Sequence, residues 1–133
     1  MTPSLEPATA RLRVLIVDDN RYVREAVKGL FELMPRVGYV STAASGETGL
    51  ALASSGAFDL VVLDLSMEGL NGLEVARRLR TLPQPPKIVM VTLYDDPDFR
   101  FAAASLGVSA FMAKPALAGQ IEPLLERMFG EPA

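Results

Sequence analysis

Short apolar runs and helix-like stretches alternate five times along this chain, and this alternation narrows the folds open to it. The runs are rich in β-branched residues, as in strands buried on both faces of a sheet. The predicted strands span residues 13–17, 39–43, 60–63, 87–91 and 108–112. Strands that alternate with helices predict a parallel sheet covered by helices on both faces. We therefore expect the α/β class, with a doubly wound five-stranded sheet.

The stretches between the predicted strands carry apolar residues three and four positions apart, which is the pattern of one helix face. Val23, Val27 and Leu30 form such a face in the first stretch. Residues suited to begin or end a helix flank these stretches. The predicted N-caps are Asn20, Ser45, Asn71 and Asp96, and the predicted stops are Pro35, Gly56, Pro83 and Gly107. The last helix contains Pro123, which we expect near its start because the first turn tolerates proline.

Composition excludes several kinds of chemistry. The 133 residues include no cysteine and no histidine, which excludes disulfides, thiol chemistry, histidine ligation and phosphohistidine formation on this chain. The net charge is −3 and the 13 basic residues form no long run, which argues against direct nucleic-acid binding. No apolar stretch has the length of a membrane span, and the start of the chain lacks a signal-peptide core. A cytoplasmic protein is the expectation.

The length is that of a single domain. Residues 1–10 contain two prolines without apolar periodicity, and we predict a flexible leader there. The folded domain is expected over residues 11–130, followed by a short tail at residues 131–133.

Polar side chains follow four of the five predicted strands. Asp18 and Asp19 end the first strand, Asp64 ends the third, Thr92 ends the fourth, and Lys114 follows the fifth. Because the carboxyl ends of parallel strands meet at one edge of a sheet, these five groups should converge in one crevice. Taken alone, each aspartate is commonly a turn or helix-capping residue, and the threonine and lysine are ordinary surface groups. Their common edge favours a joint site.

Such a crevice needs positive charge. Two carboxylates about 4 Å apart repel by about 4 kcal/mol at an effective dielectric constant near 20. Lys114 offers one positive charge, and a divalent hard cation such as Mg²⁺ would supply two through carboxylate oxygens. A metal, a hydroxyl group and a lysine around one remaining carboxylate suit phosphoryl transfer, with that carboxylate as the in-line nucleophile.

The chain resembles the receiver domains of two-component response regulators from about Arg11 to Phe129. The stretches that carry the resemblance are Val14-Leu15-Ile16-Val17-Asp18-Asp19-Asn20, Leu63-Asp64-Leu65-Ser66-Met67 with Gly69 and Gly72-Leu73-Glu74, Val91-Thr92, and Phe111-Met112-Ala113-Lys114-Pro115. The resemblance implies a flavodoxin-like fold with strand order 2-1-3-4-5.

The resemblance also implies a phosphorelay function in signal transduction. Asp64 would accept a phosphoryl group from a phosphohistidine of a sensor histidine kinase or a histidine phosphotransfer protein. Asp19 and Asp64 would bind Mg²⁺ directly, Asp18 would help through water, and the carbonyl of Ser66 would complete the protein ligands. The absence of histidine agrees with this, because the donor must belong to another chain.

Further roles follow from the same resemblance. Thr92 and Lys114 would hold the phosphoryl oxygens, and Phe111 would be the switch aromatic that turns inward as Thr92 moves. The Lys114–Pro115 peptide bond is expected to be cis. The fourth helix, fifth strand and fifth helix would carry a partner or homodimer surface, where Phe101 lies off the apolar stripe and is expected to be exposed.

Four positions near the expected site are notable: two depart from the family's usual pattern, and two lie where the family varies the lifetime of the phosphorylated state. Glu68 replaces a usual proline, and Leu93 replaces a usual small residue, so its bulk would narrow the approach to Asp64. Ser66 and Tyr94 occupy positions that affect the lifetime of an aspartyl phosphate in the family.

The residues leave three functions open. The first is a phosphoacceptor switch, not an enzyme in its own right, either as a stand-alone receiver or as a fragment of a DNA-binding regulator. The second is a receiver-like binding module that acts without phosphorylation, suggested by Leu93 and Glu68. The third is a hydrolase with an aspartate nucleophile, which the absence of an Asp-x-Asp signature disfavours, because Ser66 occupies its second position.

Overall fold

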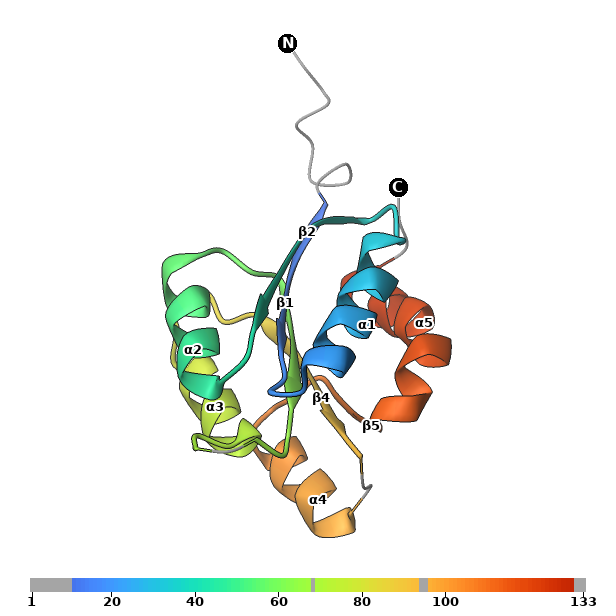
Figure 1. Cartoon of the computed structure of the whole chain (residues 1–133). Coiled ribbons are helices and arrows are strands. Elements are labelled where there is room, and N and C mark those ends of the chain that lie inside the picture. The colour runs from blue at the N-terminus through green and yellow to red at the C-terminus, as the bar shows by residue number, and fades with distance from the viewer. Residues whose placement is uncertain (1–10, 68, 94–95, 131–133) are drawn as a thin grey trace.

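Five parallel strands form one sheet at the centre of the molecule (Figure 1). The computed structural model describes residues 11–67, 69–93 and 96–130. The strands are β1 (Leu12–Val17), β2 (Val37–Ala43), β3 (Leu60–Asp64), β4 (Lys87–Thr92) and β5 (Ala110–Ala113). Their order is β2-β1-β3-β4-β5, as predicted. The predicted leader and tail lie outside the described residues.

Helices cover both faces of this sheet. They are α1 (Arg21–Glu32), α2 (Gly46–Ser55), α3 (Gly72–Leu79), α4 (Pro97–Ser105) and α5 (Leu117–Phe129). Figure 1 shows α1 and α5 on one face, and α2 and α3 on the other. Buried Ala103 of α4 belongs to the same apolar cluster as the buried residues of α2 and α3. None of the described helices is long and apolar enough to cross a membrane.

Side-chain caps fix the starts of four helices. Asn20 accepts hydrogen bonds from the amides of Tyr22 and Val23, and the other three predicted caps act in the same way. Ser45 accepts from Thr48, Asn71 from Glu74, and Asp96 from Asp98. Each cap satisfies amides that have no partner within the helix and so fixes where the helix begins. All four N-cap predictions are confirmed.

The central strand β3 is buried along its whole length. Its side chains alternate between two apolar clusters because successive residues of a strand point to opposite faces. Val61 and Leu63 pack on the side of α2 and α3, whereas Leu60 and Val62 pack on the side of α1 and α5. Each such buried side chain stabilises the fold by about 1.5–3 kcal/mol. The sheet therefore holds the end of β3 rigidly, and that end is Asp64.

Two predictions about the last part of the chain are wrong. Within the described residues no peptide bond is cis, so the Lys114–Pro115 bond is trans. Lys114 opens a 3-10 turn (η3, Lys114–Ala116), and a trans proline fits the start of such a turn, where its missing N–H is not needed. Helix α5 begins directly after this turn, so Pro123 lies inside the helix and not near its start.

Gly72 allows α3 to start close against the end of β3. A Cβ atom there would lie 2.4 Å from the carbonyl oxygen of Asp64 and 2.7 Å from the Cα atom of Leu65. Both are backbone atoms of the strand end, so they cannot move aside cheaply. We expect Gly72→Ala to lower the free energy of unfolding by about 2–3 kcal/mol, measured by urea denaturation. Gly119→Ala is the control, because open space surrounds that helical position, and it should stabilise by about 0.5–1 kcal/mol.

Candidate functional site: an acidic cluster at the strand ends

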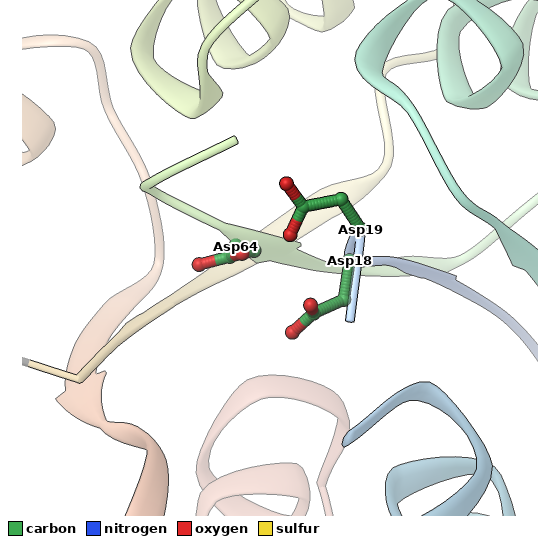
Figure 2. A group of neighbouring side chains, drawn as sticks. All are labelled: Asp18, Asp19 and Asp64. Atoms are coloured by element: carbon green, nitrogen blue, oxygen red, sulfur yellow. The ribbon is translucent and has the colours of Figure 1, made fainter. Parts of the chain in front are cut away.

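Three aspartates meet where β1 and β3 end. Asp18 and Asp64 are buried, each 2% exposed, whereas Asp19 is exposed. Each side chain offers one carboxylate oxygen, and these three oxygens lie within 4.8 Å of one another. Figure 2 shows Asp18 and Asp19 turning their carboxylates to opposite sides, with Asp64 beside them. Strand β1 lies between β2 and β3, so the strand order reverses its direction between β1 and β3. Open α/β sheets bind their ligands at the carboxyl ends of the strands at such a switch point.

Lys114 supplies the positive charge of this cluster. Its Nζ atom lies 2.9 Å from Oδ2 of Asp18 and 3.4 Å from Oδ2 of Asp64. Burial lowers the pKa of Lys114, but its hydrogen bond to Asp18 and the charges of Asp64 and Asp18 outweigh that effect. The pKa of Lys114 therefore lies above its usual value, and the lysine is charged at neutral pH.

Backbone amides hold the two buried carboxylates in place. The amide of Asn20 donates to Oδ1 of Asp18 at 2.8 Å, and the amide of Ser66 donates to Oδ1 of Asp64 at 3.2 Å.

The guanidinium of Arg24 donates to the carbonyl oxygen of Asp18 at 2.9 Å. Sequence reasoning missed Arg24, although its place one helical turn after the N-cap Asn20 was a usable signal.

Burial makes Asp64 hard to ionise in the metal-free protein. Burial and the nearby charge of Asp18 raise the pKa of Asp64 to about 6, while Lys114 and the amide of Ser66 act in the opposite direction. Lys114 alone therefore does not offset the negative charge around Asp64, and the raised pKa of Asp64 reflects this.

The cluster fits a hard divalent cation. Its donors are carboxylate oxygens, which Mg²⁺ prefers over nitrogen or sulfur ligands. Among the described residues, the three carboxylates and the ammonium group of Lys114 together carry two negative charges in excess when all are ionised. The donor chemistry and the charge excess both match Mg²⁺.

Thr92 and Phe111 lie on the two strands beyond β3. Thr92 ends β4 and is 2% exposed, and the residue before it, Val91, is the register partner of Asp64. Phe111 on β5 is also buried, 9% exposed, among the apolar residues of the face that α2 and α3 cover.

Leu93 points largely into solvent at 61% exposed. Glu68 and Tyr94, two of the four positions singled out in the sequence, lie outside the described residues.

Comparison with known protein families decides what this arrangement is. The sequence pattern of the response regulator receiver domain family matches residues 14–126. This range includes Asp18, Asp19, Asp64, Thr92 and Lys114. The chain belongs to the response regulator receiver domain family. A receiver domain is a signalling domain of two-component systems, and the receiver has the predicted flavodoxin-like fold.

Curated relatives of this receiver are response regulators. The nitrate/nitrite response regulator protein NarL of Escherichia coli (strain K12) is 35% identical over 109 residues, which are 82% of this chain and 49% of NarL. The transcriptional regulatory protein LiaR of Bacillus subtilis (strain 168) is 29% identical over 83% of this chain and 52% of LiaR. The receiver thus spans about half the length of the curated relatives it matches.

A solved receiver structure agrees with the fold. The signal receiver domain of the putative response regulator NarL from Mycobacterium tuberculosis superimposes with a TM-score of 0.83 at 27% identity. That comparison covers 92% of this chain and 99% of the other.

Proposed function

We propose that Asp64 is the phosphoacceptor of this receiver and that Mg²⁺ assists the transfer. The observation that carries this proposal is the meeting of Asp18, Asp19 and Lys114 around the buried carboxylate of Asp64. Asp64 is held by its strand and by the amide of Ser66, so one carboxylate oxygen keeps a fixed direction for attack. A receiver domain of the histidine kinase CKI1 from Arabidopsis thaliana, 25% identical, has been solved in complex with Mg²⁺.

The transfer uses Asp64 as an in-line nucleophile. An oxygen of Asp64 forms a bond to phosphorus as the P–N bond to the donor imidazole breaks, and the imidazole leaves with the electron pair. Lys114 and Thr92 would bind the oxygens of the transferred phosphoryl group. Asp19, Asp64 and the carbonyl of Ser66 would hold Mg²⁺, with Asp18 binding through water. The ion would supply positive charge for the phosphoryl oxygens.

The proposed partner is a sensor histidine kinase or a histidine phosphotransfer protein. The 133 residues contain no histidine, so the phosphohistidine would lie outside this receiver. The proposed response is a change of the surface formed by α4, β5 and α5, with Phe111 as the switch aromatic. Phe99 and Phe101 on α4 are 44% and 76% exposed, so the expected exposure of Phe101 is confirmed. We propose that these aromatic side chains contribute to a homodimer or partner contact.

The whole protein is proposed to regulate transcription. LiaR is a transcriptional regulatory protein, and the receiver covers 52% of its length. In such a protein the receiver would not contact DNA itself, since its net charge is −3 and its basic residues form no long run.

The test of the proposed function is covalent labelling. We expect the wild-type protein, incubated with Mg²⁺ and acetyl phosphate, to gain the mass of one phosphoryl group in an intact-mass measurement. Asp64→Asn should gain none, and a chelator should suppress the gain in wild type. Glu126→Gln, which removes one exposed carboxylate from α5, is the matched control and should be labelled like wild type. An unlabelled wild type would favour a binding module that works without phosphorylation, and equal labelling of Asp64→Asn would place the acceptor elsewhere.

A further inference from the structure

An arginine of α4 reaches across to the edge strand β5. Nη1 of Arg100 donates to the carbonyl oxygen of Phe111 at 3.2 Å. The guanidinium carbon of the same residue lies 5.0 Å from the centre of the Phe111 ring. Arg100 therefore contacts both the backbone and the ring of one residue, through a hydrogen bond and a cation–π interaction.

This double contact matters because α4 buries little of its surface. Within Pro97–Ser105, all of which the structure describes, Ala103 is the one buried residue. β5 is the last strand of the sheet and has only four residues, so it is paired along one side only. Arg100 adds a hydrogen bond to this short edge strand from outside the sheet, through the carbonyl oxygen of Phe111.

The position of β5 sets the position of Lys114. The strand ends at Ala113, the register partner of Thr92, and Lys114 follows immediately. Phe111 lies two residues earlier, paired with Met90 and buried at 9% exposed. A shift of the Phe111 ring or of its backbone would thus change where the ammonium group meets Asp18 and Asp64.

We propose that Arg100 is a positioning residue for the phosphoacceptor site. It holds Phe111 in the buried position and so keeps β5, and with it Lys114, in place for an incoming phosphoryl group. The contact of Arg100 with Phe111 favours the state in which Lys114 is in place, and this state binds the phosphoryl group more tightly. By the same linkage, binding of the phosphoryl group should strengthen the contact of Arg100 with Phe111. This inference rests on the proposed function, because its readout is the occupancy of that site.

Beryllofluoride, a mimic of the phosphoryl group, provides the test. The full chain is titrated with beryllofluoride in excess Mg²⁺, and the amide signal of Thr92 is followed by NMR well below the melting temperature. We expect Arg100→Gln to weaken the apparent affinity about threefold to tenfold. Arg100→Lys keeps a cation and a donor, and it should recover at least half of the loss on a logarithmic scale.

Two further variants separate positioning from general effects. Arg127→Gln removes the same charge from an exposed position on α5 and should bind like wild type, which controls for electrostatic attraction of the anion. Phe111→Leu removes the ring, so the effect of Arg100→Gln should be smaller in that background. Wild-type affinity in Arg100→Gln, or the same loss with and without the Phe111 ring, would overturn the positioning role. Failure of the wild type itself to bind would instead overturn the proposed function.

Discussion

Replacing Lys114 with Gln should lower the free energy of unfolding of the metal-free protein by about 3 kcal/mol at pH 7. The side chain of Lys114 is 12% exposed, and those of its partners Asp18 and Asp64 are 3% and 2% exposed. Removing the ammonium group leaves two buried carboxylates that repel each other without their counter-charge. Urea denaturation in the presence of a chelator measures the loss.

Three comparisons identify the cause of this loss. Arg127→Gln removes a positive charge from an exposed position and should change the free energy of unfolding by less than about 0.5 kcal/mol. Asp18→Asn combined with Lys114→Gln should recover most of the stability, because one of the two buried charges is then absent. Added Mg²⁺ should restore part of it by supplying positive charge. A Lys114→Gln protein as stable as wild type would show that the ion pairs contribute little.

Replacing Asp64 with Asn should have the opposite effect and stabilise the metal-free protein by roughly 1–3 kcal/mol at pH 7. The pKa of Asp64 is raised to about 6 by burial and by Asp18, so its ionised form is disfavoured in the folded state. Asparagine keeps the size of the side chain and removes the charge. Thermal and urea unfolding of both proteins, with a chelator present, measure the difference.

The pH dependence of that difference follows from the direction of the shift. Since the folded-state pKa of Asp64 is about 6 and its usual value is 3.8, the folded protein binds more protons than the unfolded chain between these values. The contribution of Asp64 to stability is therefore fully present below pH 3.8 and is lost as the pH rises through 6. The gain from Asp64→Asn should be near zero at pH 3.5 and reach its full size above pH 7. A gain that is independent of pH would contradict this assignment.

The sequence predicted the strands and caps well because local patterns determine them. The apolar run that ends at Asp64 and the N-cap residues Asn20, Ser45 and Asp96 depend on near neighbours in the chain. The convergence of Asp18, Asp64 and Lys114 also followed from sequence, because parallel strands with right-handed crossovers place their carboxyl ends at one edge. The structure adds the distances, which show that Lys114 contacts Asp18 more closely than Asp64.

Features that depend on contacts between distant elements could not be predicted in this way. The trans bond before Pro115 depends on the 3-10 turn that joins β5 to α5, and the family pattern had favoured the other isomer. The contact of Arg100 with Phe111 joins two elements through one long side chain, and no spacing rule indicates it. Helix α5 begins at Leu117, whose side chain is buried. Because the helix begins this early in the chain, Pro123 lies inside it.

The loop between α3 and β4 offers a place to attach a reporter. The groups of the site come from the carboxyl ends of strands, whereas this loop, with Gln84 exposed, leads into the opposite end of β4. The chain contains no cysteine, so a Gln84→Cys substitution would provide a single thiol for a fluorescent dye. A dye at Gln84 would leave Asp64, Thr92 and Lys114 untouched, and labelled protein could report kinase binding and phosphorylation in real time.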